Sequence, residues 1–91
     1  MSFSNQDIMD RFKNFAHGKC ECCKKQLVWD NRDFGDKGAW HAHHVVPRKV
    51  KTDDSILNMA ILCINDPNCH LNQGHGGNYQ DAQPRWMWDC N

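Results

Sequence analysis

Six cysteines in a chain of 91 residues constrain its fold more than any other feature of the sequence. A domain this short has a thin apolar core and often needs a metal ion or disulfides for stability. Cys20 and Cys23 have the C-x2-C spacing of a metal-binding turn, and Cys63 and Cys69 form a second, wider pair. We therefore predict a structural zinc site that takes its four ligands from these two pairs.

The assignment within this cysteine set has an alternative, because Cys22 is adjacent to Cys23. We prefer Cys23, since two intervening residues let the turn curl around the ion, and we leave Cys22 and Cys90 outside the site. Three disulfides are the other use of six cysteines. The opening residues, MSFSNQDIMD, have neither the basic nor the apolar region of an export signal, so we favour the metal and expect a cytoplasmic protein.

The chain opens with the pattern of an amphipathic helix. Ser4 suits the N-cap position, and Ile8, Phe12 and Phe15 recur at the spacing of one helical face. Gly18 suits the end of this helix. Three strand-like runs follow, at residues 26–29, 39–47 and 56–63.

A short helix is predicted after the third run. Asp66 suits its N-cap and Pro67 its first turn, and Gly74 suits the position just beyond its end. Two strands followed by this helix make a compact ββα unit. In the remaining tail, Trp86 and Trp88 are expected to complete the small core. No apolar run is long enough to span a membrane.

Half of the six histidines fall within the octet WHAHHVVP. Alternate residues of a strand face the same side, so His41 and His43 share a face while His44 points to the other. His70 and His75 follow the second cysteine pair, and closure of the zinc site would bring His70 against the strand of His43. The alternative is that these histidines are ordinary polar surface residues. A separate zinc site that brings the two groups of histidines together favours a reactive site instead.

Together, the segments CECC, HHVVP, ILNMAILC and CH resemble the HNH endonuclease family, in its branch with a four-cysteine zinc site. The resemblance covers about residues 18–72. It implies an α+β fold, a small ββα-metal (His-Me finger) domain, here with an N-terminal helix. We expect one domain over residues 1–91, with a motif core at about 18–75 and a tail at 76–91.

The resemblance also implies roles for individual residues. His44 would be the general base, and Asn58 would hold the loop between the strands so that the base points correctly. His43 and His70 would bind a catalytic divalent ion, such as Mg²⁺, Mn²⁺, Ni²⁺ or Zn²⁺. No second histidine follows His70 at α-helical spacing, so the third ligand is His75, with Asn72 or water as alternatives.

The charge balance bears on the partners of the protein. Eleven basic and eleven acidic residues give zero net charge, which is unusual for a tight stand-alone nucleic-acid binder and hints at a partner protein. Arg48 and Lys49 follow the histidine strand and are predicted to contact DNA phosphates, with solvated surface charge as the alternative.

These observations favour a metal-dependent DNA endonuclease or nickase that uses a histidine base. We expect double-stranded DNA as substrate, with weak sequence preference. Two alternatives remain open. One is a zinc-stapled module that binds nucleic acid or protein without cleavage, and the other is a toxin-type nuclease domain controlled by an inhibitor protein.

Overall fold

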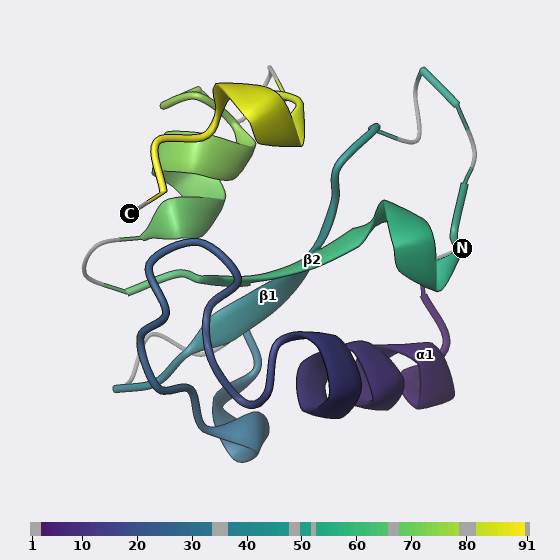
Figure 1. The fold of residues 1–91 in the computed structure, drawn as a ribbon, viewed down its shortest axis with the longest axis vertical. Coiled ribbons are helices and arrows are strands. Elements are labelled where there is room, and N and C mark those ends of the chain that lie inside the picture. The colour runs from purple at the N-terminus through teal and green to yellow at the C-terminus, as the bar shows by residue number, and fades with distance from the viewer. Residues whose placement is uncertain are drawn as a thin grey trace.

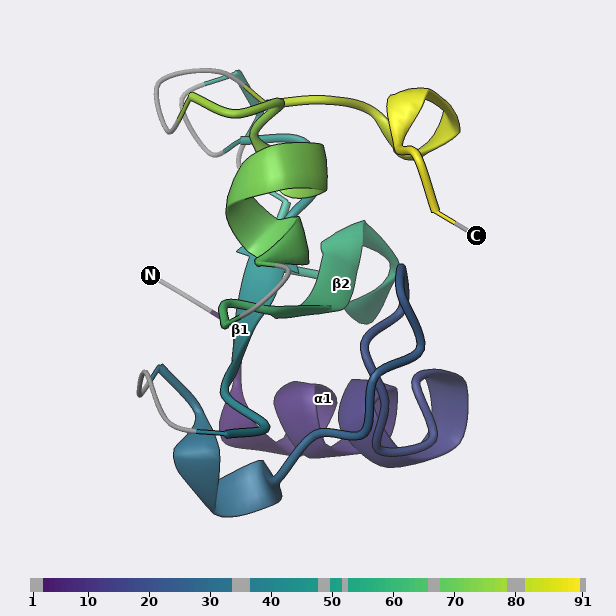
Figure 2. The ribbon, with the colours of Figure 1, turned by 90° about the vertical axis from the view of Figure 1, so that its left-hand side faces the viewer.

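A computed structural model describes residues 3–33, 37–47, 50–51, 53–65, 68–78 and 82–90. Its centre is an antiparallel pair of strands, β1 (Trp40–His44) and β2 (Met59–Cys63). The helix α1 (Asn5–Asp10) lies on one side of this pair, and the short helix η4 (His70–Gly74) lies on the other (Figures 1 and 2). The predicted α+β fold with a ββα unit is confirmed.

The first helix begins where the sequence predicts. The hydroxyl of Ser4 accepts a hydrogen bond from the amide of Asp7 at 3.1 Å, which satisfies a donor of the first turn. Ile8 and Phe12 are buried, as their spacing implies. The helix ends near Gly18, whose φ of 73° is the left-handed conformation that glycine adopts at low cost.

The same helix contains a feature that the sequence pattern missed. After α1 the chain widens into a π-helical turn, η1 (Arg11–Phe15). Such a turn takes in one more residue than an α-helical turn, so it shifts the face on which later side chains emerge. Ala16 is therefore buried, whereas Phe15 is 49% exposed beneath the guanidinium of Arg11. The prediction that Phe15 lies on the buried face is wrong.

The predicted strand at residues 26–29 does not form. Leu27 donates its amide hydrogen to Gly18 and Val28 donates to Gly38, so neighbouring residues pair with two different segments. A ladder cannot extend when each residue has a separate partner. The chain turns instead into a short 3₁₀ helix, η2 (Trp29–Asn31).

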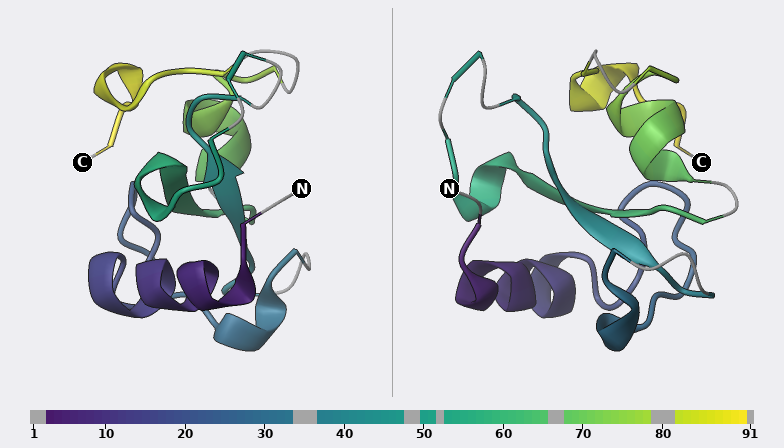
Figure 3. Two further views of the ribbon diagram at one scale, coloured as in Figure 1. Left: turned by 90° about the vertical axis from the view of Figure 1, so that its right-hand side faces the viewer. Right: turned by 180° about the vertical axis from the view of Figure 1, so that it is seen from behind.

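The two observed strands are shorter than the predicted runs. β1 ends at His44, and β2 is preceded by a 3₁₀ turn, η3 (Ile56–Asn58), rather than beginning at residue 56. His44 pairs with Met59 at one end of the ladder and Trp40 pairs with Cys63 at the other. The strand pair crosses the middle of the molecule, with α1 and η1 beneath it in both views (Figure 3). Every residue of β2 is buried.

The free edge of β2 is covered by side chains and by the cysteine turn. The amide of Glu21 donates to the carbonyl of Ile61 at 2.8 Å, and the Glu21 carboxylate accepts from the amide of Ile61 at 2.6 Å. Arg85 donates to the carbonyl of Met59 at 2.6 Å. These contacts satisfy groups that an uncovered edge strand would leave open for pairing with another chain.

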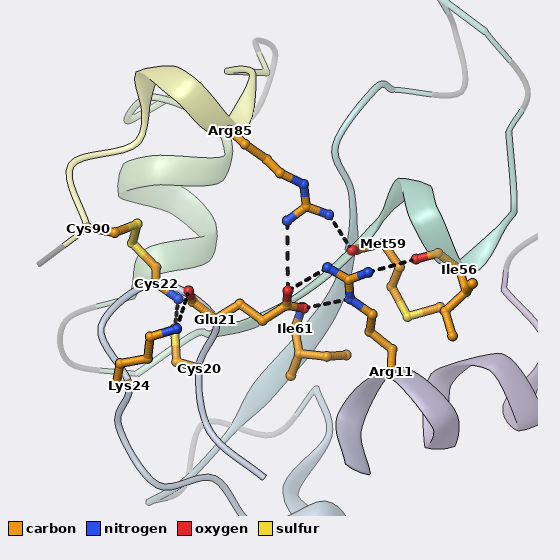
Figure 4. Close-up of polar contacts among 10 residues, drawn as sticks. All are labelled: Arg11, Cys20, Glu21, Cys22, Lys24, Ile56, Met59, Ile61, Arg85 and Cys90. Carbon is orange, nitrogen blue, oxygen red and sulfur yellow. Dashed lines mark hydrogen bonds and ion pairs between the residues drawn. A yellow bond between two sulfur atoms is a disulfide. The ribbon is translucent and has the colours of Figure 1, made fainter. Parts of the chain in front are cut away.

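Glu21 is also the centre of a buried ion pair (Figure 4). Its carboxylate accepts two hydrogen bonds from Arg11, at 2.6 and 3.0 Å, and the Arg85 guanidinium approaches from the opposite side at 3.8 Å. The Arg11 and Glu21 side chains are only 9% and 13% exposed. One carboxylate thus joins the first helix, the cysteine turn, β2 and the tail.

We predict that Glu21→Ala lowers the free energy of unfolding by roughly 3–5 kcal/mol, because it leaves the guanidinium of Arg11 buried without its partner. Urea denaturation followed by circular dichroism measures the loss. Glu21→Gln retains an oxygen for the amide of Ile61 and should lose less. A loss below about 1 kcal/mol, as for a surface ion pair, would contradict this role of Glu21.

The tail is fastened by a disulfide between Cys22 and Cys90, with a Cα–Cα distance of 4.8 Å. The sequence leaves these two cysteines outside the zinc site but does not predict that they pair. Trp88 packs against the core, as expected, and donates its indole hydrogen to the carbonyl of Gln83. Trp86 is 83% exposed, so it does not contribute to the core as predicted.

Cys90→Ser should lower the free energy of unfolding by about 2–4 kcal/mol, because the disulfide closes a long loop in the unfolded chain. Urea denaturation with and without a phosphine reductant tests this. The reductant should lower the wild-type value to that of the variant and leave the variant unchanged. Peptide mapping that pairs Cys90 with a cysteine other than Cys22 would refute the assignment.

Two predicted positions lie outside the described residues, namely Asp66 and Pro67 at the start of the short helix. The described part of that helix is η4, a π-helical turn that ends at Gly74. Within the ranges that the structure describes, no helix combines the length and the apolar character needed to cross a bilayer.

Candidate active site and metal centres

The predicted cysteine site comes together as one cluster of sulfur atoms. Cys20 and Cys23 lie on the turn that follows the first helix, while Cys63 ends β2 and Cys69 immediately precedes η4. Their four Sγ atoms lie within 4.8 Å of one another. Cys23 rather than Cys22 joins the cluster, because Cys22 is bound to Cys90.

The geometry of this cluster suits a tetrahedral ion. A metal–sulfur bond of about 2.3 Å in a tetrahedron places neighbouring sulfurs about 3.8 Å apart. The Sγ atoms of Cys23 and Cys63 are 3.8 Å apart. The cluster therefore fits a structural metal site, and its closed, largely buried set of four sulfurs leaves no position for a substrate.

Hydrogen bonds within the cluster favour negative charge on the sulfur of Cys20. The backbone amides of Cys22 and Cys63 donate to the sulfur of Cys20, and the amide of Cys69 donates to the sulfur of Cys63. The thiols of Cys63 and Cys69 lower the pKa of Cys20, because both donate hydrogen bonds to its sulfur. The same contacts raise the pKa of Cys63 to about 11 and also raise the pKa of Cys69, because each of these thiols keeps the hydrogen that it donates. Thiolates are the form that binds metal, so Cys20 is ready for a cation, whereas Cys63 and Cys69 would give up their protons as the metal binds.

A second cluster brings together three of the predicted histidines. His43 comes from β1, while His70 opens η4 and His75 directly follows it. One ring nitrogen of each lies within 4.8 Å of the others, and the Nε2 atoms of His70 and His75 are 3.1 Å apart. These distances suit three ligands of a single ion.

The π-helical turn of η4 explains how His75 reaches the cluster. Residues five apart do not repeat on one face of an α-helix, but they do in a turn with i→i+5 hydrogen bonds. The amide of His75 donates to the carbonyl of His70 at 3.1 Å, which closes this wider turn. Asn72, the alternative third ligand, is exposed.

The electrostatic state of the histidine cluster also suits a metal. Burial, together with the neighbouring imidazoles of His70 and His75, lowers the pKa of His43 to about 3. His70 has its pKa lowered to about 3 for the same reasons. Both rings are therefore neutral near pH 7, with a lone pair available for a metal ion. Within the described residues, the buried Nε2 of His43 has no hydrogen-bond partner.

Gly74 allows η4 to approach β1 closely enough to complete the cluster. A Cβ atom at this position would lie 3.0 Å from Nε2 of His43 and 3.1 Å from Cδ1 of Leu62. Both distances are shorter than ordinary van der Waals contact, so a side chain here would displace the metal-binding face of His43.

We predict that Gly74→Ala weakens binding of a divalent ion to the histidine cluster by roughly 10-fold while leaving the cysteine site intact. Calorimetric titration of Ni²⁺ into protein already loaded with one equivalent of Zn²⁺ measures the affinity. Asn72→Ala is the matched control on the same turn and should bind Ni²⁺ as the wild type does. Wild-type affinity in Gly74→Ala would contradict the role of the close approach at Gly74, and a loss of affinity in Asn72→Ala would make Asn72 a ligand.

His44, the predicted general base, lies at the end of β1 and does not join the histidine cluster. It lines a pocket of about 240 Å³ together with residues from the N-terminal segment, α1, the loop before β1 and β1 itself: Phe3, Ile8, Arg32, Asp33, His41 and Ala42. Its Nε2 atom is 2.8 Å from the Oδ1 atom of Asp54. His41, on the same strand, pairs with Asp33 at 2.6 Å and contacts the ring of His70.

Asn58 clasps the two loops that flank the strands. Its side-chain oxygen accepts from the amide of Val46, and its side-chain nitrogen donates to the carbonyls of Val46 and Asp53. Its carbonyl accepts from the amide of Val45 at 3.0 Å. Asn58 is 6% exposed, so its side chain is held between the chain that follows β1 and the loop that precedes β2.

A family model described as HNH endonuclease matches residues 20–76, which is more than half of the chain. The chain belongs to the HNH endonuclease family. No curated protein and no solved structure matches the chain. The resemblance inferred from the cysteine and histidine motifs is thereby confirmed, and membership indicates a nuclease or a nucleic-acid-binding protein.

The HNH match contains the cysteine and histidine clusters together with His44 and Asn58. Other residues that shape the site escape sequence reasoning. Asp54 belongs to no motif, and Gly74 is predicted only as the end of a helix, so the contacts of these two residues with His44 and His43 are not anticipated. The predicted phosphate-binding residues, Arg48 and Lys49, lie outside the described residues.

Proposed function

We propose that this HNH protein is a metal-dependent endonuclease or nickase that hydrolyses phosphodiester bonds of DNA, with His44 as the general base. The observation that carries the proposal is the cluster of His43, His70 and His75 on the strand and helix next to His44. Three protein ligands leave coordination positions open, which is typical of a catalytic rather than a structural metal site.

Two metals have distinct places in this proposal. Zinc suits the four cysteines, because a closed set of thiolates is the usual structural zinc site. A divalent ion held by the three histidines would supply positive charge to the phosphate and to the leaving 3′ oxygen.

The residues of the chain perform the remaining steps. The imidazole of His44 accepts a proton from water as the water oxygen bonds to phosphorus and the bond to the 3′ oxygen breaks. Asn58 keeps the loop after β1 in place, so that the His44 ring is held where β1 ends. Arg48 and Lys49 follow this strand in the sequence, and we propose that they contact DNA phosphates.

We expect His44→Ala to lower the rate of plasmid nicking by about 10²- to 10⁴-fold, because water loses its proton acceptor. The assay follows conversion of supercoiled plasmid to the open circle with Mg²⁺, Mn²⁺, Ni²⁺ or Zn²⁺. Circular dichroism and the zinc content should remain those of the wild type.

His17→Asn is the matched control for loss of an imidazole. His17 is exposed and has a φ of 55°, a conformation that asparagine tolerates, so this variant should nick at the wild-type rate. Wild-type nicking by His44→Ala would remove His44 as the base. A wild-type protein that binds the plasmid but nicks it with none of the four ions would instead be a non-cleaving binding module.

A further inference from the structure

The ring of His44 is held on two sides by groups from distant parts of the chain. The ring of Phe3 stacks on it, with centroids 3.9 Å apart and an angle of 16° between the planes. The carboxylate of Asp54 lies in hydrogen-bond contact with Nε2 at 2.8 Å. The His44 and Asp54 side chains are 19% and 26% exposed, so water competes little for this contact.

The loop that carries Asp54 is itself fixed. Asn58 donates a hydrogen bond to the carbonyl of Asp53 at 2.8 Å, and the Asp53 carboxylate accepts from the amide of Ser55 at 3.0 Å. Asp54 therefore lies between two residues whose positions are set by hydrogen bonds. Because Asn58 also bonds to Val46, the same side chain determines the distance between the His44 end of β1 and the Asp54 loop.

A carboxylate without a proton can only accept hydrogen bonds, so its partner nitrogen must carry the hydrogen. A neutral imidazole carries its hydrogen on one nitrogen and a lone pair on the other. The hydrogen bond that one nitrogen makes decides which of the two carries the hydrogen. With Nε2–H directed at Asp54, the lone pair belongs to Nδ1. Among the described residues, none forms a hydrogen bond with that nitrogen.

We propose that Asp54 is a positioning residue that holds His44 in the Nε2–H tautomer, so that Nδ1 is the atom that accepts the proton from water. The stacked Phe3 ring opposes rotation of the imidazole about its Cβ–Cγ bond and so keeps Nε2 beside the carboxylate. This inference rests on the proposed function for the identity of the base. The contact between Asp54 and His44, however, is measurable without any DNA.

The first test is the tautomer of His44, read from long-range ¹H–¹⁵N spectra of the zinc-loaded protein at pH 8. The wild type should show Nε2–H and an unprotonated Nδ1. In Asp54→Asn the amide offers an N–H as readily as an oxygen, so both tautomers should appear. A wild-type ring protonated at Nδ1, or a tautomer unchanged in Asp54→Asn, would overturn the proposal.

The matched control is Asp53→Asn, which removes the same charge one residue away. Asparagine retains an oxygen for the amide of Ser55, so the loop should keep its shape. This variant should leave the His44 tautomer and the rate of nicking at wild-type values. If Asp53→Asn shifts the tautomer as Asp54→Asn does, the negative charge near His44 determines the tautomer, rather than the hydrogen bond that Asp54 accepts. The proposal would then fail.

The second test is the rate of plasmid nicking. Asp54→Asn should lower kcat by about 10- to 100-fold with little change in KM, because the loss concerns orientation of the base rather than DNA binding. Asp54→Glu should recover part of the rate by restoring a carboxylate. Wild-type kcat in Asp54→Asn would count against a positioning role.

These two readouts separate the inference from the function on which it rests. A protein that nicks no DNA but keeps an Asp54-dependent Nε2–H tautomer supports the contact and contradicts the nuclease proposal. A protein that nicks DNA through His44, with the tautomer and kcat indifferent to Asp54, supports the nuclease proposal and overturns the inference.

Discussion

The convergence of four sulfur atoms fixes the geometry on which the candidate active site depends. Cys63 ends β2 and Cys69 precedes η4, so the cluster holds both ends of the connection between them. His70 is the next residue along the chain, so the position of Cys69 in the cluster also sets the position of His70. His43 faces it because β1 pairs with β2 in a single register. In this short chain the four-cysteine cluster thus helps to position the histidines, because the apolar core is small.

Much of the fold could be predicted because its signals are local. A serine before a helical repeat specifies a cap, and two apolar runs specify the strand pair. The errors arise where long-range contacts override local pattern. Phe15 lies outside the buried face because a π-helical turn replaces an α-helical one. Residues 26–29 have strand-like composition, but their amides find two different partners.

The site was partly predictable for a related reason. Cysteine and histidine are rare residue types with few structural uses, so the spacing of Cys20 and Cys23 or the succession of Cys69 and His70 carries information. Aspartates and glycines are common in loops, and nothing in the sequence distinguishes Asp54 from its neighbour Asp53. The role of His75 depends on a π turn whose hydrogen bond spans five residues, which no α-helical pattern anticipates.

The disulfide and the sulfur cluster place opposite demands on one short stretch of chain, because Cys22 lies between two thiols that must stay reduced. An oxidised chain without metal has many ways to pair its six cysteines. An ion that takes up four sulfurs shields them from exchange and leaves one pairing, Cys22 with Cys90. The order of maturation would therefore matter: metal loading before oxidation would favour the pair Cys22–Cys90, and oxidation before metal loading would allow other pairs to form.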